Sequence, residues 1–259
     1  MDSTATERFS RAFPCHQAAL DIYGGAWTTA MPEGSGLKAG EQDHFTDGRV
    51  TWAAKMLAGL AGKTILELGP YEAYNTRQFE TMGAASVVAI ENNRDNFLKC
   101  LIIKNIVGLR SVFLHGDMLE YLDGTHARYD LCWASGVLYH VTDPIRLLEG
   151  ITRVAKTAFV WTHYVHPARW SDPTASPFFD PSKRKAISYE GRLITLHHRN
   201  YNQRVGSHFG GGPESYSYWM EYEDIVHVLA ARGFRRIEMG IDNPRHPSGA
   251  ACFFIAHTD

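Results

Sequence analysis

Short apolar runs alternate with stretches of helical length from Lys63 to Thr162, and this alternation limits the folds that the chain can adopt. Helices are expected between the runs, the longest over residues 94–107. Strands that alternate with helices along a chain form a parallel sheet with helices on both faces. The sequence therefore predicts an α/β fold. Five runs predict its first strands, at residues 64–68, 86–90, 111–114, 129–134 and 157–162.

The segments on either side of this core complete the expected sheet. Asp47 is placed to cap a helix over residues 49–60. A helix over residues 222–232 precedes two further strand candidates, at 235–240 and 251–257. We therefore expect a mostly parallel sheet of seven strands.

Two segments fall outside this pattern. Residues 1–45 combine glycines and a proline with aromatic residues, which indicates an ordered arm or lid. Residues 163–215 interrupt the alternation after the fifth strand and predict an inserted cap, with a short strand over residues 192–196, within a domain over 46–259. Aromatic residues in the two segments either close over a site or only bury apolar surface. These residues are Tyr23, Trp27, Trp170, Phe178 and Phe179.

Length and composition exclude several classes of protein. A chain of 259 residues with 44% hydrophobic content can bury a full core. The formal net charge of -2 shows no basic excess that would favour a nucleic-acid partner. No apolar run reaches the roughly 18 residues of a membrane span, and no secretion signal is expected at the start. The 4 cysteines form no CxxC pair, so we expect a cytoplasmic protein with reduced thiols.

Polar residues stand at the ends of the first three predicted strands, where ligands bind in open α/β sheets. The first strand ends in Glu67 and Gly69, and the glycine lets a ligand approach the backbone. The second ends in Glu91, where a carboxylate can accept both hydroxyls of an adenosine ribose. The third runs into Asp117, whose side chain can accept the adenine amino group. This order of residues predicts a nucleoside cofactor.

The same residues carry a resemblance to class I methyltransferases, which have a Rossmann-like fold and bind S-adenosylmethionine (SAM). In that family an acidic residue and a glycine-rich turn hold the methionine part of SAM. The usual E-x-G-x-G-x-G pattern keeps Gly69 here but has Tyr71 and Ala73 at its other glycine positions. SAM has no pyrophosphate, so this turn suits SAM better than NAD, and a dehydrogenase is the less favoured alternative.

A second resemblance lies after the fourth predicted strand. Residues 134–144, with the sequence ASGVLYHVTDP, resemble the GVLYH signature of the family that contains the transfer-RNA wobble-uridine carboxymethyltransferase. Residues 49–52 resemble the Arg- and Trp-bearing segment before the cofactor strand of that family. The resemblance implies a subfamily without fixing the substrate. The basic residues expected to grip transfer RNA are not prominent, so this activity is kept as an alternative.

The resemblance implies a donor site at the strand ends. Arg49 would pair with the methionine carboxylate; the alternative is that it is only a solvated residue of a helix. Asn75 would reach the amino-acid part of the cofactor, or caps a helix. For Asp117, the alternative to a contact with adenine is that it only caps the turn that follows. The expected cofactor-binding residues are Arg49, Glu67, Gly69, Pro70, Asn75, Glu91, Asn92, Asp117, Met118, Ser135 and Gly136.

Three residues are expected at the acceptor side. In this fold family, residues after the fourth strand face the transferable methyl group. His140 is therefore expected there, as a general base or as a residue that only shapes the pocket. His163 and Tyr164 follow the fifth strand and would hydrogen-bond the acceptor. The spacing of the histidines in this region matches no familiar ligand set, so no metal is expected. These histidines are His163, His166, His197, His198 and His208.

The sequence thus predicts SAM-dependent methyl transfer to an oxygen or nitrogen of a small-molecule acceptor, by in-line displacement. Two alternatives stay open. One is a transferase that modifies the wobble uridine of transfer RNA, and the other is a methyltransferase-like subunit without activity that serves as a binding partner. No membrane partner is expected, and the oligomeric state stays open.

Overall fold

The computed structural model describes residues 9–169, 178–201 and 212–258. The main sheet contains β1 (Thr64–Leu68), β2 (Ser86–Glu91), β3 (Val112–His115), β4 (Leu131–Ser135), β5 (Thr157–His163), β9 (Phe234–Asn243) and β10 (Ala251–Thr258). A second sheet contains β6 (Lys185–Tyr189), β7 (Arg192–Asn200) and β8 (Tyr216–Trp219). The helices are α2 (His16–Leu20), α3 (Gly48–Met56), α4 (Tyr74–Thr81), α5 (Arg94–Val107), α6 (Met118–Gly124), α7 (Pro144–Val154) and α8 (Tyr222–Ala231), and a short 3-10 turn, η2, spans Leu138–His140.

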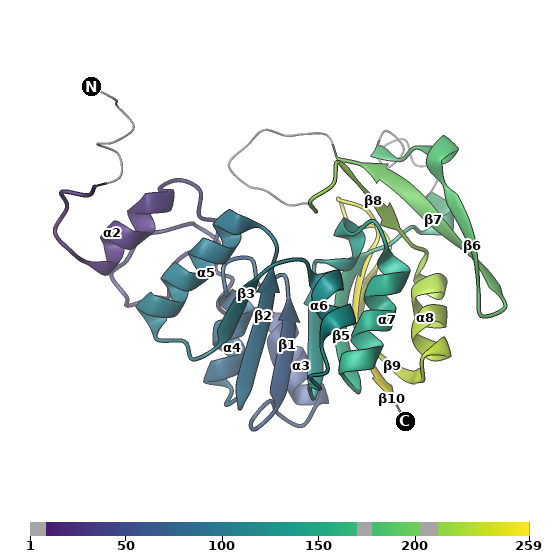
Figure 1. The fold of residues 1–259 in the computed structure, drawn as a ribbon, viewed down its shortest axis with the longest axis horizontal. Coiled ribbons are helices and arrows are strands. Elements are labelled where there is room, and N and C mark those ends of the chain that lie inside the picture. Colours follow the sequence, from purple (N-terminus) through teal and green to yellow (C-terminus); the bar gives the residue numbers. More distant parts are fainter. Residues whose placement is uncertain (1–8, 170–177, 202–211, 259) are drawn as a thin grey trace.

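The main sheet has the strand order β3-β2-β1-β4-β5-β10-β9 (Figure 1). Strands β1 to β5 run parallel, and β10 runs antiparallel to both of its neighbours, β5 and β9. The predicted seven-stranded, mostly parallel α/β sheet is therefore confirmed. The order reverses between β1 and β4, and the carboxyl ends of strands at such a reversal flank the crevice where these sheets bind ligands.

Most predicted elements lie within a few residues of their expected bounds, and α5 has the bounds that were predicted. The helix expected over residues 49–60 ends earlier, at Met56, because Ala58 and Gly59 adopt positive φ angles. Helix α6 was not predicted, although Asp117 is its capping residue. The strands β6 and β8 were not predicted either, and both are short.

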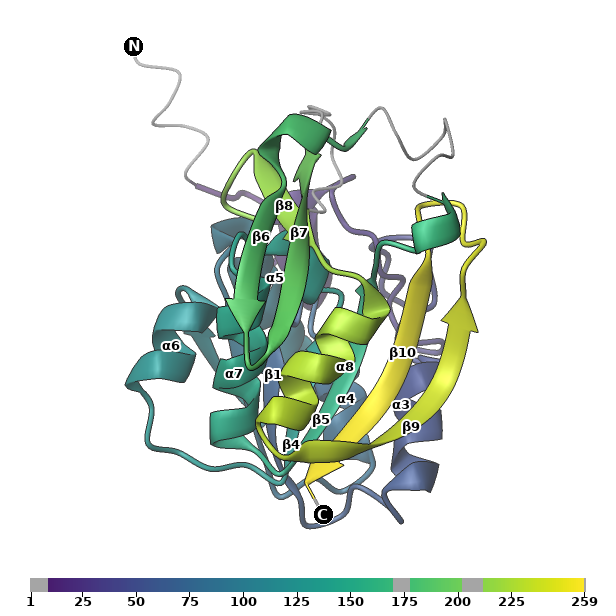
Figure 2. The same cartoon turned by 90° about the vertical axis from the view of Figure 1, so that its right-hand side faces the viewer.

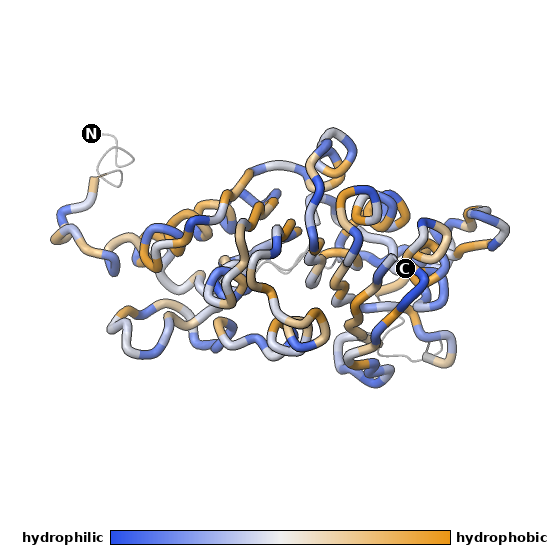
Figure 3. The backbone as a smooth tube through the Cα atoms, turned by 90° about the horizontal axis from the view of Figure 1, so that it is seen from below, coloured by the Kyte–Doolittle hydropathy of each residue, from blue (hydrophilic) through white to orange (hydrophobic). Residues whose placement is uncertain are grey.

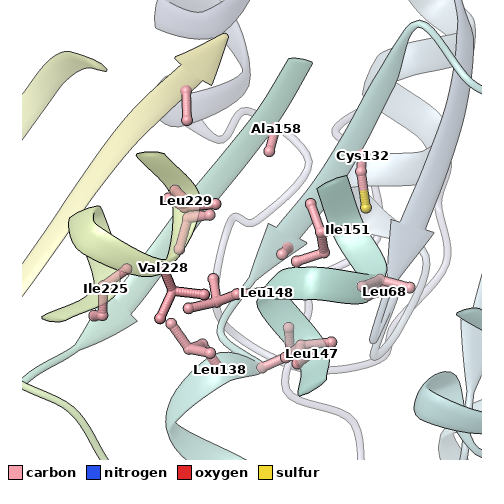
Figure 4. Close-up of a cluster of buried hydrophobic side chains, with 14 of the residues drawn as sticks. Leu68, Cys132, Leu138, Leu147, Leu148, Ile151, Ala158, Ile225, Val228 and Leu229 are labelled. Atoms are coloured by element: carbon pink, nitrogen blue, oxygen red, sulfur yellow. The ribbon is translucent and has the colours of Figure 1, made fainter. Parts of the chain in front are cut away.

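Side chains alternate between two faces along each central strand. Leu66 and Leu68 of β1 point to the face covered by α6, α7 and α8, where they join a cluster of buried apolar side chains (Figure 4). Ile65 joins a second cluster on the opposite face, with Val50 of α3 and Phe79 of α4. The central strands β1, β4 and β5 are mostly apolar because both of their faces are covered, which explains why they are visible in the sequence.

The helices that cover the sheet have an apolar and a polar side. In Figure 3, hydrophobic and hydrophilic stretches follow one another along the helical coils. In α7, for example, Leu147, Leu148 and Ile151 are buried, whereas Arg153 is exposed. No helix in the described part of the chain combines the length and the hydrophobicity needed to cross a membrane.

The sheet β6-β7-β8 is the cap that was expected after β5, and it stands above the ends of α7 and α8 (Figures 1 and 2). The cap contacts the segment after β4. The Tyr218 N–H donates to the carbonyl oxygen of Val141 at 3.1 Å. The Trp219 indole N–H donates to the carbonyl oxygen of Tyr139 at 3.0 Å. The cap therefore extends past the predicted limit at residue 215, through the whole of β8.

A buried ion pair fastens the N-terminal arm to the loop between β1 and α4. Lys99 Nζ lies 2.9 Å from Glu72 Oε1, and the two side chains are 6% and 0% exposed. Glu72 also accepts hydrogen bonds from the N–H groups of Thr28 and Thr29, at 3.1 Å and 2.8 Å. Trp27 is buried beside this pair, with Lys99 Nζ 5.3 Å from its ring centroid.

The arm therefore buries apolar surface against α5, which is the second of the two roles considered for its aromatic residues. Tyr23 also faces Lys99 Nζ, at 5.8 Å from its ring centroid. Trp27 belongs to a cluster with Cys100 and Ile103 of α5. Figure 1 shows the arm lying along α5 at the end of the molecule away from the cap.

We predict that Glu72→Gln lowers the free energy of unfolding by about 3–5 kcal/mol, because it leaves the buried Lys99 cation without its counter-ion. Urea denaturation followed by circular dichroism measures the change. The double variant Glu72→Gln/Lys99→Met should recover part of the loss. Glu120→Gln, which breaks an ion pair between exposed side chains, should change stability by less than about 1 kcal/mol. Equal effects of the two single Gln variants would contradict the arrangement described.

Candidate active site

The loop between β1 and α4 keeps the shape of a glycine-rich turn although two of its expected glycines are replaced. Gly69, Tyr71 and Ala73 have φ angles of 68°, 58° and 59°. A Cβ atom on Gly69 would come within 2.6 Å of Val137 Cγ1, so no larger residue fits there. The left-handed conformation costs a non-glycine residue about 1–2 kcal/mol. Such strain persists only where the surrounding contacts hold it.

Backbone amides hold the carboxylate of Glu91 at the end of β2. The Tyr71 N–H donates to Oε2 at 3.1 Å, and the Asn93 N–H donates to Oε1 at 2.9 Å. The Asn92 N–H also bonds to this carboxylate. Burial raises the pKa of Glu91 to about 6, against the opposite effect of these amides. Each carboxylate oxygen has two lone pairs, so Glu91 can hold the loop and still accept hydroxyl groups.

Glu67 is buried between β1 and α4, where the hydroxyl of Thr76 donates a hydrogen bond to its Oε2. Burial raises the pKa of Glu67 to about 8, and the charge of nearby Glu91 acts in the same direction. Most of the Glu67 side chains are therefore neutral at pH 7. The observed role of Glu67 is to tie β1 to α4, and its contact with a cofactor stays a prediction.

Asp117 is the N-cap of α6. Its Oδ1 accepts hydrogen bonds from the N–H groups of Leu119 at 2.7 Å and Glu120 at 3.3 Å. The alternative that Asp117 caps the turn after it is thus confirmed. Its carboxylate is exposed and stays accessible to a ligand. Met118 is buried beneath α6 and belongs to the apolar cluster of that face.

The end of β4 offers a close approach to the backbone and an unpaired hydroxyl. Gly136 has a φ angle of 80°, and a Cβ atom there would lie 3.2 Å from the ring of Trp161. Within the described ranges, the buried Ser135 Oγ has no hydrogen-bond partner. An unpaired buried polar atom is unfavourable, so Ser135 is suited to bond a bound molecule.

Arg49 and Asn75 belong to a polar network beside this loop. Arg49 forms a bidentate pair with Asp47, in which the closest distance is 2.6 Å. The Asn75 amide donates to Asp47 Oδ2 and accepts from Trp133 Nε1, both at 3.1 Å. Arg49 also lies 5.0 Å from the ring centroid of Trp161, so it is not a solvated residue. Asn75 is not the N-cap of α4, and the capping alternative is wrong.

His140 contacts a tyrosine of the cap. Its Nδ1 lies 2.6 Å from the Tyr201 hydroxyl oxygen, and this hydroxyl donates to the carbonyl oxygen of Tyr139 at 3.2 Å. We therefore assign the proton of the imidazole to Nδ1, which leaves Nε2 as an acceptor. Burial, and then the charges of Arg199 and His163, lower the pKa of His140 to about 3. The ring is neutral at pH 7 and is a weak base.

His163 also contacts Tyr139. Its Nδ1 lies 3.0 Å and 3.3 Å from the carbonyl oxygens of Gly249 and Ala250, which can only accept, so Nδ1 carries the proton. Its ring stacks on Trp219 with a centroid distance of 5.2 Å and meets Tyr139 edge-on at 4.7 Å. Burial lowers the pKa of His163 to about 4. His140 and His163 are thus two neutral rings, and each contacts the ring of Tyr139.

Tyr164 does not join these residues. Its hydroxyl donates to Asp242 Oδ1 at 2.6 Å, and its ring belongs to the apolar cluster beneath α7 and α8. Neighbouring residues of a strand point to opposite faces, so the geometry that brings His163 to the site turns Tyr164 away. The prediction that Tyr164 bonds the acceptor is therefore wrong for this structure.

Three residues of the cap meet at this site that sequence analysis did not single out. Arg199 and Tyr201 come from the end of β7, and Trp219 comes from β8. The strand was expected only as far as residue 196, so these positions seemed to lie in an irregular segment. The spacing of Arg199 and Tyr201, which places both on one face of an extended chain, was the available signal.

No group of three or more His, Cys, Asp or Glu side chains in residues 9–169, 178–201 and 212–258 is arranged to hold a metal ion. His197 and His198 are neighbours on β7 and point to opposite faces. His208 lies outside the described residues, as does Trp170. A separate cavity of about 480 Å³ is lined by His166, Ala168, Pro244 and Arg245.

We predict that Glu67→Gln stabilises the protein increasingly as the pH rises. The raised pKa means that the folded protein keeps a proton on Glu67 between about pH 4.5 and 8, whereas the unfolded chain releases it. Stability from this group is full below the unfolded pKa and is lost as the pH rises through the folded pKa. The gain over wild type should grow by roughly 2–4 kcal/mol between pH 5 and 8.5.

Urea titrations at several pH values measure this difference. The exposed Glu41→Gln serves as the control and should show no such trend. A constant difference between Glu67→Gln and wild type at all pH values would contradict the assigned protonation.

The sequence of this chain is similar to those of known methyltransferases. Residues 66–158 match the family model Methyltransf_11, described as a methyltransferase domain. The chain is also 32% identical, over 109 residues, to a tRNA U34 carboxymethyltransferase of Marinobacter nauticus. That match covers 40% of this chain and 33% of the relative, so the chain aligns with about a third of the relative's length.

Solved structures share the fold over nearly the whole chain. The N-terminal domain of EvdMO1, in a structure with SAH and D-fucose, is 20% identical, with a TM-score of 0.72. The alignment covers 94% of this chain and 95% of that domain. Magnesium protoporphyrin IX methyltransferase from Synechocystis PCC 6803, with bound SAH, is 12% identical with a TM-score of 0.55, covering 99% and 95% of the two chains. Residues 66–158 therefore match a methyltransferase domain, and the chain has the Rossmann-like fold of the solved SAM-dependent methyltransferases.

Proposed function

We propose that the chain transfers a methyl group from SAM to an oxygen or nitrogen atom of a small-molecule acceptor. One observation carries this proposal. The loop that Glu91 holds and the Tyr139–His140 turn lie at the carboxyl ends of β1 and β4, on either side of the reversal in strand order. A donor held by the loop would be presented to an acceptor held by the Tyr139–His140 turn.

The residues at the strand ends fit SAM. Glu91 retains lone pairs for ribose hydroxyls, Gly69 permits close approach to the loop, and Ser135 has an unpaired buried hydroxyl. We also place Asp117 at the adenine end, with Asn92 and Met118 beside it. When bound, SAM supplies a methyl group attached to a positively charged sulfur. The chain's own contribution is to hold the donor in place and to keep its methyl group aimed at the acceptor.

At the acceptor side, we assign His140 and His163 to positioning. Both rings carry their proton on Nδ1 and present Nε2 as an acceptor to a hydroxyl or amine. With a pKa of about 3, His140 removes a proton poorly at neutral pH, so it serves orientation better than general-base catalysis. Methyl transfer to a well-placed nucleophile needs alignment above all.

A second candidate function is modification of a transfer-RNA uridine. The 32% identity over 109 residues to a tRNA U34 carboxymethyltransferase favours it. This candidate requires a basic surface and salt-sensitive RNA binding, and the formal net charge of -2 argues against it. We also propose a cytoplasmic location, where the free thiols of Cys15, Cys100, Cys132 and Cys252 would stay reduced.

Calorimetric titration with SAH, the demethylated product of SAM, tests the donor site. Wild type should bind, and Glu91→Gln should weaken binding at least tenfold, because an amide replaces the carboxylate that accepts the ribose hydroxyls. Asp95→Asn, at an exposed carboxylate shortly after β2, should leave the affinity unchanged. Absence of wild-type binding at millimolar SAH would remove the proposal, and equal affinity of Glu91→Gln would remove Glu91 from the site.

The role of His140 can be tested with methyl-labelled SAM and small hydroxyl and amine compounds as acceptors. Tyr201→Phe should slow transfer by roughly tenfold, because it frees the imidazole to rotate and change tautomer, while SAH affinity is unchanged. Tyr189→Phe removes a tyrosine hydroxyl of the cap that bonds Glu149, and should leave transfer unchanged. The rate should not fall between pH 8 and 6 through protonation of His140. A loss near pH 6.5 that disappears in His140→Gln would instead identify a general base.

A further inference from the structure

Arg199 is a cation surrounded by aromatic rings. Its guanidinium carbon lies 5.3 Å, 5.4 Å and 5.0 Å from the ring centroids of Phe178, Tyr201 and Trp219. Arg199 is half-buried, and this burial lowers the pKa of its guanidinium. Among the described residues, no carboxylate forms an ion pair with Arg199.

Other arginines around the cap have acidic partners. Arg192, on the same strand, lies 2.7 Å from Asp224 Oδ1, and Arg232 pairs with Glu149. The surroundings of Arg199 differ because its neighbours are rings, which meet the face of the guanidinium. Cation–π contacts occupy that face and leave the N–H donors at the edge for an acceptor in the guanidinium plane.

Arg199 is part of the acceptor side of the site. Trp219, which it contacts, stacks on His163 with an interplanar angle of 7°. Tyr201, its other contact, bonds His140. The positive charge of Arg199 acts to lower the pKa values of Tyr139, His140 and His163, because it disfavours the protonated form of each group. The proposed acceptor side therefore combines a positive charge with several aromatic rings.

We propose that the acceptor is a planar aromatic acid, whose carboxylate pairs with Arg199 while its ring packs among the aromatic side chains of the cap. This inference rests on the proposed function and names its substrate class. A guanidinium binds a carboxylate through two parallel hydrogen bonds, and a partly desolvated site strengthens them. Flat rings pack edge-on or offset against Trp219 and against Phe179, which lies 5.3 Å from Trp219. The carboxylate anchors the molecule, and a second group, a hydroxyl or an amine, would face His140.

Calorimetry on the SAH-saturated protein tests the proposal with matched pairs of probes. Benzoate and salicylate are the acids, and benzamide and salicylamide are their neutral counterparts of the same shape. We expect the acids to bind at least tenfold more tightly than the amides. Arg199→Met should abolish this preference, with little effect on the amides. Arg199→Lys, which keeps the charge but loses the planar fork, should retain part of it.

Arg245→Met is the control for non-specific attraction to positive charge, since Arg245 lines a cavity with His166, Ala168 and Pro244 and does not belong to the rings around Arg199. It should leave the preference for acids intact. Equal binding of acids and amides, no binding of any acid at about 10 mM, or loss of the preference in Arg245→Met but not in Arg199→Met would each overturn the proposal.

The titration with SAH separates this proposal from the one on which it rests. Unchanged SAH affinity and melting temperature show that Arg199→Met is folded and that its donor site is intact. SAH binding without any preference for acids rejects only the substrate class. Failure of wild type to bind SAH rejects the proposed function itself.

Discussion

The carboxylate of Glu91 connects the parts of this structure on which a donor site depends. It accepts the N–H of Tyr71 and thereby holds the β1–α4 loop in a left-handed conformation that its side chains do not favour. The Tyr71 hydroxyl in turn meets Thr28 Oγ1 at 2.8 Å, and the next residue, Glu72, binds the arm and Lys99. One continuous set of polar contacts therefore runs from the end of β2 through the loop to the N-terminal arm.

Much of the fold could be predicted because the central strands are buried on both faces. Their apolar runs are continuous, and helix signals such as the Asp47 cap lie between them. The residues at the ends of these strands were also predictable, since topology brings those ends to one edge of the sheet. The replacement of glycine at Tyr71 and Ala73 made the loop look degraded, yet both residues keep positive φ angles. Contacts from β2 and from the N-terminal arm preserve the backbone conformation of this loop. Such contacts between distant segments cannot be read from a local sequence motif.

The acceptor side was less predictable because it depends on contacts between distant segments. Tyr164 was grouped with His163 by sequence position, although alternation along the chain sends their side chains to opposite faces. Arg199, Tyr201 and Trp219 reach the site only because the cap folds over the turn after β4. The same packing buries His140 and lowers its pKa to about 3. Of the two roles considered for this histidine, this value favours a residue that shapes the pocket over a general base. The two neutral imidazoles and the guanidinium of Arg199 are the groups on which the proposed aromatic-acid acceptor rests.

A crystal structure of the chain with SAH tests the central claim most directly, because it shows whether the preformed loop is the donor site. The account predicts ribose hydroxyls within about 3.2 Å of Glu91, unchanged left-handed residues in the β1–α4 loop, and the sulfur turned toward the Tyr139–His140 turn. A complex in which the ribose lies away from Glu91, or in which the loop refolds to admit the ligand, would contradict it.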